Sequence, residues 1–204
     1  MEFRLIYGGS LLKAAHGTKT RSWEKHQIRR QFHEQLKRLW ETHPLLIFYS
    51  RPMHFEKDRN RLILREPDTA IEKVAAHFEG YVPLVNGDFG MVCDLDILFL
   101  RPEPAGKLFR EGKGGGDIDN RLKTLMDALK MPQRGQVKVK EGDGEDPNPF
   151  FVLLQDDALV TSVRVTTDRL LTVDDNCDPA EACVIISVGI RVADPIRSPY
   201  GADL

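Results

Sequence analysis

Two long segments of the chain alternate between apolar residues and polar or small residues with a period of two. This period is typical of a β-strand that buries one face, because successive side chains of a strand point to opposite sides. A sheet with one buried face is therefore the basis of the predicted fold. The apolar positions are Cys93, Leu95, Ile97 and Phe99 in residues 91–100, and Val184, Ile186, Val188, Ile190 and Val192 in residues 182–193.

The rest of the pattern predicts helices and shorter strands around this sheet. Apolar residues recur at helical spacing from Ser22, a suitable N-cap, to His43, where Pro44 ends the helix. Residues 67–78 are also predicted to be helical, and so are residues 117–130, whose apolar stripe is Ile118, Leu122, Leu125, Met126 and Leu129. Shorter strands are predicted at residues 2–7, 45–49, 61–66, 150–154 and 158–167.

This order of elements predicts an α+β fold: a single domain over residues 1–192, with a mixed β-sheet and about three helices packed against it. The segment 131–149 is rich in Gly, Pro and charge, so it is expected to be a long loop with a small β-excursion over residues 136–140. Residues 193–204 are expected to form a flexible C-terminal tail.

Targeting signals and cysteine usage narrow the class of protein. The sequence contains no apolar run of 18 residues and no secretory signal pattern, so a cytoplasmic protein without a membrane segment is expected. Its three cysteines, Cys93, Cys177 and Cys183, have no C-x2-C spacing. Neither a disulfide framework nor a structural zinc site is therefore indicated.

The formal net charge of −2 hides a segregation of charge along the chain. Residues 13–38 carry eight basic and two acidic residues, and residues 101–140 carry ten basic and five acidic residues. Residues 141–204 carry four basic and thirteen acidic residues. This asymmetry suits a protein with one side that faces a polyanion, although solvated surface charge also explains any single run.

Two aspartates, Asp117 and Asp119, open the helix predicted at residues 117–130. They could serve only as N-cap and helix-dipole partner, since unpaired N–H groups at a helix start favour negative charge. Helical spacing also aligns Asp119 with Lys123 and Asp127 on one polar row, bordered by Asn120. The same environment should keep both carboxylates ionised, as a hard cation requires.

A second acidic pair, Asp156 and Asp157, follows the apolar segment 150–154. Several carboxylates from two elements, together with a lysine, suit metal-assisted phosphodiester hydrolysis, in which Mg²⁺ or Mn²⁺ polarises the phosphate and activates water. A further pair, Asp94 and Asp96, would point to one side of a strand and is more simply explained by an exposed polar sheet face.

The segments DIDNRLKTLMDAL (117–129) and DDALV (156–160) resemble the RusA family of Holliday junction resolvases, whose pattern is D-x-D-N-x-x-K-x-x-x-D-A-L followed by a D-D pair. The resemblance covers roughly residues 90–192. It implies a homodimeric, Mg²⁺-dependent DNA endonuclease that nicks four-way junctions in recombination and repair, as found in bacteria and their phages. Compared with the family, the segment 44–90 is expanded and the loop 131–149 is inserted.

Carried over residue by residue, the resemblance implies that Asp117, Asp119 and Asp157 bind the metal and that Lys123 is the catalytic lysine. Asn120, Asp127 and Asp156 would be supporting residues. The alternatives are a RusA-fold protein that binds nucleic acid or regulates without cleaving, and, more distantly, a phosphohydrolase of small nucleotides. Candidate DNA-binding residues are Lys13, Lys19, Arg21, Lys107, Arg110, Lys113 and Arg121.

Overall fold

A computed structural model describes residues 1–10, 18–50, 70–101, 118–133, 135–137, 144–171 and 181–193. The predicted strand 61–66 and the tail from residue 194 lie outside these residues. The described strands are β1 (Glu2–Ser10), β2 (Tyr81–Val85), β3 (Met91–Arg101), β4 (Phe150–Leu154), β5 (Val160–Arg169) and β6 (Glu181–Val192). The helices are α1 (Thr18–Thr42), α2 (Pro44–Ser50), α3 (Ala70–His77) and α4 (Ile118–Leu129), with 3-10 turns η1 (Gly87–Phe89) and η3 (Asp157–Leu159).

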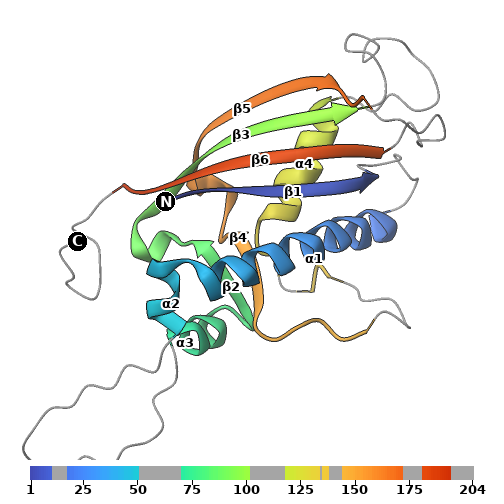
Figure 1. Cartoon of the computed structure of the whole chain (residues 1–204). Helices are drawn as coiled ribbons and strands as arrows, with labels where there is room; N and C mark the ends of the chain where they lie inside the picture. The colour runs from blue at the N-terminus through green and yellow to red at the C-terminus, as the bar shows by residue number, and fades with distance from the viewer. Residues whose placement is uncertain are drawn as a thin grey trace, which may run out of the picture.

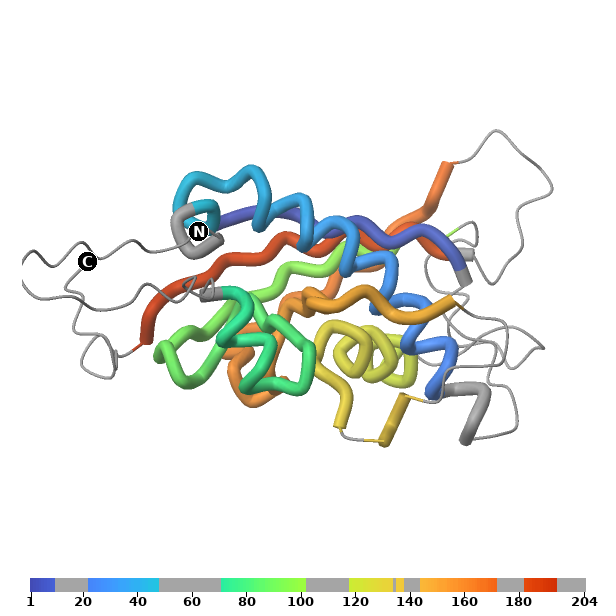
Figure 2. The backbone as a smooth tube through the Cα atoms, turned by 90° about the horizontal axis from the view of Figure 1, so that it is seen from below, coloured from blue at the N-terminus to red at the C-terminus, as the bar shows by residue number. Residues whose placement is uncertain are grey.

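The main sheet has four strands in the order β1-β6-β3-β5. β6 is antiparallel to both of its neighbours, whereas β3 and β5 are parallel. The predicted α+β class with a mixed sheet is therefore confirmed. The helices lie on one side of this sheet, as Figures 1 and 2 show from two directions. No helix in the described ranges is long and apolar enough to cross a membrane.

The alternation of β3 and β6 is confirmed on the side of the sheet that faces the helices. The side chains of Cys93 and Ile97 are fully buried there, as are those of Val184 and Ile186. The pattern weakens at the end of β6, where Val192 is 51% exposed. α1 supplies the facing apolar side chains Ile28, Phe32 and Leu36.

A second, two-stranded sheet lies within the helix layer. β2 and β4 run parallel, with Tyr81 opposite Phe150 and Val85 opposite Leu154. Every residue of β4 is buried, which explains its continuous apolar run, since parallel strands are covered on both faces. Beyond the end of α4, Met131 N–H donates to the Leu154 carbonyl at 2.8 Å. The end of α4 is therefore tied to the end of β4.

Between residues 44 and 85, one sequence prediction is wrong and one strand was missed. Residues 45–49 form helix α2 instead of a strand, because a short apolar run fits either structure and Pro44 is favourable at a first helical position. The N–H groups of Leu46 and Ile47 donate to the His43 carbonyl at 3.0 Å. Strand β2 was not predicted, and its internal Pro83 argues against a strand in sequence terms.

The loop predicted at 131–149 is irregular wherever it is described. Residues 136 and 137 belong to no strand, and residues 138–143 lie outside the described residues. Its second half is nevertheless anchored. The Asp146 carboxylate accepts from Arg30 Nε at 2.8 Å, and the Gly144 carbonyl accepts from Arg30 Nη2 at 2.9 Å. The segment 144–149 therefore lies against α1.

Candidate functional site

The first half of α4 carries three of the predicted site residues. Asp119 lies in the first turn of the helix, and Asp119, Asn120 and Lys123 are all exposed. Helical spacing places Lys123 one turn after Asp119 on the same side of the helix. Asp117 immediately precedes α4 and lies outside the described residues. The first half of the predicted polar row is therefore accessible to a ligand.

Arg121 was predicted to contact DNA, and its position contradicts this prediction. Its exposed fraction is 2% because it belongs to the face of α4 that packs against the core. The apolar stripe of α4 is rotated relative to the prediction, since Ile118, Leu122 and Met126 are half-buried. The buried residues of the helix are Arg121, Thr124, Leu125, Ala128 and Leu129.

The other end of α4 is held by ion pairs and hydrogen bonds. The Asp127 carboxylate lies 2.5 Å from Lys25 Nζ of α1 and 3.7 Å from Lys130 Nζ. Buried Arg29 donates from Nη2 to the Asp127 carbonyl at 2.7 Å and from Nε to the Lys130 carbonyl at 3.1 Å. These carbonyls lie in and directly after the last turn of the helix, whose partial negative charge favours a cation. Asp127 therefore joins α1 to α4.

The acidic pair after β4 also has local partners. Asp156 is the N-cap of η3, because its Oδ1 accepts from Ala158 N–H at 2.9 Å. Asp157 Oδ2 lies 2.8 Å from Lys130 Nζ, and this hydrogen bond holds the pKa of Asp157 below its usual value. Partial burial opposes the charge on Lys130, but its carboxylate partners raise the pKa of Lys130 above its usual value.

Asp119 and Asp157 are associated with opposite ends of α4. Asp157 contacts Lys130, which follows the last residue of α4, whereas Asp119 lies in its first turn. At a rise of about 1.5 Å per residue, the Cα atoms of residues 119 and 130 are about 16 Å apart. In the part of the chain that the structure describes, no three His, Cys, Asp or Glu side chains are arranged to hold a metal ion. The described residues alone therefore do not form the predicted three-carboxylate centre.

The basic character of α1 is largely balanced by acidic residues that are distant in sequence. His26 Nε2 lies 2.9 Å from each oxygen of Asp146, and Arg30 Nη2 lies 2.7 Å from Oδ1 of the same carboxylate. Together with the Lys25–Asp127 pair and buried Arg29, these contacts involve every basic residue between positions 25 and 30 of α1. The polyanion-facing side predicted from residues 13–38 is therefore neutralised at Lys25 and Arg30, whereas Lys37 and Arg38, further along α1, are exposed.

The other predicted DNA-binding residues lie in or beside the two segments that follow β1 and β3, and these two strands end on the same side of the sheet. β1, β3 and β5 run in one direction and end together, at Ser10, Arg101 and Arg169. α4 begins beneath this half of the sheet (Figure 1). Lys13, Lys107, Arg110 and Lys113 lie outside the described residues, and so do the side chains of Lys19 and Arg21 in α1.

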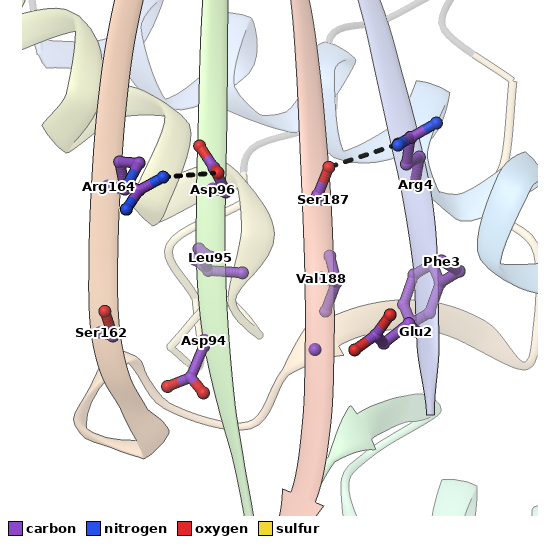
Figure 3. A pocket seen from close by; sticks show the side chains of 11 residues that line it. Glu2, Phe3, Arg4, Asp94, Leu95, Asp96, Ser162, Arg164, Ser187 and Val188 are labelled. Carbon is purple, nitrogen blue, oxygen red and sulfur yellow. Dashed lines mark hydrogen bonds and ion pairs between the residues drawn. The ribbon is translucent and has the colours of Figure 1, made fainter.

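The uncovered face of the main sheet carries Asp94 and Asp96, as predicted for an exposed polar face. Asp94 Oδ1 accepts from Thr161 Oγ1 at 2.5 Å, and Asp94 Oδ2 lies 3.6 Å from Arg191 Nε. Figure 3 shows these strands from close by, with a shallow groove across β1, β6, β3 and β5. Gly189 forms part of its floor. The charges of both signs that line the groove do not indicate a polyanion site.

Sequence reasoning missed Lys25, Arg29, Lys130 and the pair of His26 and Asp146. All of them except Lys130 contact partners that are about 100 residues away in the sequence, and such contacts cannot be predicted from the spacing of neighbouring residues. Lys130 had a weak local signal, because it lies three residues after Asp127 at the end of a helix.

Comparisons of the chain with protein-family models, with curated proteins and with solved structures found no match.

Proposed function

We propose that the protein is a divalent-metal-dependent DNA endonuclease of the RusA type, acting on branched DNA from a centre in the first half of α4. The proposal is supported above all by Asp119 and Lys123, which are exposed one turn apart within the D-x-D-N-x-x-K pattern. Asp117 and Asp119 are assigned to Mg²⁺ or Mn²⁺. Lys123 is assigned to the scissile phosphate, and Asn120 to orienting a carboxylate.

The chemistry of these residue types explains the assignment. Carboxylate oxygens are the ligands that Mg²⁺ and Mn²⁺ prefer, and the bound ion would polarise the phosphate and activate water. The positive end of the α4 dipole favours both the carboxylates and an incoming phosphate near the first turn. The Lys123 ammonium, one turn further on, would neutralise charge that develops on the phosphate. DNA would approach the end of the sheet where β1 and β3 stop and the basic segments begin.

Asp157 is left outside this centre. Lys130 holds it at the opposite end of α4, and its neighbour Asp156 caps η3. Asp127 is likewise assigned a structural role, because it joins α1 to α4. The centre proposed here is therefore smaller than the one implied by the family resemblance.

A second candidate function is nucleic-acid binding or regulation without cleavage. It is favoured by the position of Asp157, which Lys130 holds beyond the end of α4, whereas Asp119 lies in the first turn of this helix. Such a protein would use the basic segments beside β1 and β3 to contact the phosphate backbone. Its binding would weaken steeply with salt, as counterion release requires.

A cleavage assay separates these functions. A labelled four-way junction, a linear duplex and a nucleotide mixture are incubated with the protein, with and without Mg²⁺ or Mn²⁺. The expected product is a metal-dependent nick in the junction. Asp119→Asn should lower its rate by about 100-fold or more, because a ligand of the metal is lost.

Asp88→Asn is the matched control, since Asp88 is also an exposed aspartate in the first turn of a short helix, far from α4 in sequence. It should leave cleavage unchanged, and circular dichroism should show that both variants are folded. Salt-sensitive junction binding without any metal-dependent product would overturn the endonuclease proposal and support the binding protein. Products from nucleotides alone would instead indicate a small-molecule phosphohydrolase.

A further inference from the structure

β5 is an edge strand of the main sheet. It pairs with β3 on one side, and among the described residues no strand pairs with its other side. Most of its side chains are exposed, including that of Val163, which is 43% exposed although it points toward the helix layer. In Figure 1, β5 is the outermost strand at the top of the sheet. A long exposed edge of this kind can pair with another chain.

The backbone register identifies the groups on this edge. Leu170 N–H donates to the Arg101 carbonyl at 2.6 Å, so position 170 faces β3. Because the N–H and C=O groups of successive strand residues point in alternate directions, residues 163, 165, 167 and 169 direct theirs away from β3. The Arg169 N–H is satisfied by its neighbour's side chain, since Asp168 Oδ1 accepts it at 2.7 Å. The Asp168 carboxylate therefore lies at the outer edge.

The uncovered face of β5 carries two charged residues of opposite sign, one on each side of Thr166. Arg164, Thr166 and Asp168 share this face, and the two charged residues are equally distant from the threonine. A second β5 strand, antiparallel and centred on Thr166, would place each Arg164 opposite an Asp168. The same centre places outward-directed residues opposite one another, Val165 against Thr167, as a hydrogen-bonded ladder requires. Val163 lies opposite Arg169, whose carbonyl can accept although its N–H already donates to Asp168 Oδ1.

We propose that two copies of this chain pair antiparallel along β5, with Thr166 on the two-fold axis, so that their main sheets become one continuous sheet. The interface is independent of the proposed nuclease function, because it uses none of the residues assigned to that centre. Arg164 and the partner subunit's Asp168 form a non-hydrogen-bonded pair, the type in which opposed side chains approach most closely.

Other registers fit less well. A centre on Val165 also satisfies the backbone, but it places Arg164 opposite Thr166 and Asp168 opposite Ser162, so neither charge meets its opposite. The present partner of Arg164 is weak, since Arg164 Nη1 lies 3.8 Å from Asp96 Oδ2 and the Arg164 side chain is 77% exposed. The guanidinium can therefore turn toward a carboxylate across the edge.

Cross-linking tests the register directly. In Thr166→Cys, the two introduced thiols would lie opposite each other, at a Cα separation of about 4.5 Å that a disulfide accepts. Mild oxidation should convert this variant into a reducible covalent dimer. Ser162→Cys is the control, because this register places residue 162 opposite residue 170 and far from its own copy. Cross-linking of Thr166→Cys no greater than that of Ser162→Cys or of the unaltered protein would overturn the register.

Sedimentation tests the charges. The unaltered protein should be dimeric at about 100 μM, and Asp168→Arg should raise the dissociation constant by about 10-fold or more, because arginines then face each other at both ends. The double variant R164D/D168R exchanges the charges and should restore dimerisation. A monomeric unaltered protein at this concentration, or a double variant as weak as Asp168→Arg, would overturn the proposal. Junction cleavage is scored separately and depends on different residues.

Discussion

The two ends of α4 differ in how their charges are used. At the start of the helix, Asp119 and Lys123 are exposed, whereas at its end Asp127 and Lys130 contact charged residues from α1 and η3. Asp119, Lys123 and Asp127 belong to one sequence motif, and Lys130 follows it directly. The difference shows that a row of charges on a helix can combine an accessible half with a half that holds the fold together.

The largest effect is expected from Arg29→Ala. Arg29 is buried and donates to the Asp127 and Lys130 carbonyls, so its removal leaves these acceptors without that donor and a cavity beside α4. We expect the free energy of unfolding to fall by about 2–4 kcal/mol. Urea unfolding of Arg29→Ala and of Lys37→Ala, an exposed residue of the same helix, measures the difference. Equal stability of the two variants would refute the anchoring role.

A smaller effect per residue is expected from acid, through the buried histidines that pack near the anchored end. Burial lowers the pKa of both His26 and His33, and His33 Nδ1 accepts the Phe151 N–H at 2.9 Å, so it cannot hold a proton there. In the unfolded chain these histidines bind protons below about pH 6.5, whereas in the folded protein they stay neutral to a lower pH. Stability should therefore be constant above this pH and fall below it, by up to about 1.4 kcal/mol per pH unit for each histidine.

Chemical unfolding between pH 7.5 and 5 measures this slope. His33→Gln keeps an acceptor and removes the titration, so it should reduce the slope. His77→Gln is the control, because the His77 side chain is 68% exposed. A slope that is unchanged in His33→Gln would contradict the assignment.

The smallest effect is expected from the two lysines of the α4 region. Lys130 pairs with Asp157, but the side chains are 26% and 46% exposed, so solvent screening limits the contribution of the pair. We expect Lys130→Met to change the unfolding free energy by less than about 1 kcal/mol, and Lys123→Met by less than about 0.5 kcal/mol. In the junction assay the order should reverse, with Lys123→Met the more damaging. Equal activity of the two variants would remove the distinction between the ends of α4.

The elements with a clear period could be predicted from the sequence. β3 and the first part of β6 follow the alternating pattern that is typical of a strand with one buried face, and the position of α4 follows from the helical spacing of its apolar residues. Short or interrupted elements could not be predicted. α2 was mistaken for a strand because its apolar run is too short to show a period, and β2 was missed because of its internal proline.

The candidate site could be predicted only where its residues are neighbours on one element. Asp119, Asn120 and Lys123 share α4, and their exposure agrees with the predicted polar row. Arg121 is different, because the angular range of the buried face of a helix depends on how neighbouring elements pack against it. The relation of Asp157 to Asp119 depends on where β4 ends relative to α4, which is a property of the whole fold.

Residue order determined the alternating patterns of β3 and β6, the motif on α4 and the segregation of charge along the chain. Tertiary packing then established which of those charges meet: Asp146 with Arg30, Asp127 with Lys25, and Asp157 with Lys130. The physical reason is the distance along the chain over which each effect acts. Backbone preference and periodicity act over a few residues and are visible in the sequence, whereas an ion pair needs two groups within a few ångströms in space, however distant they are along the chain.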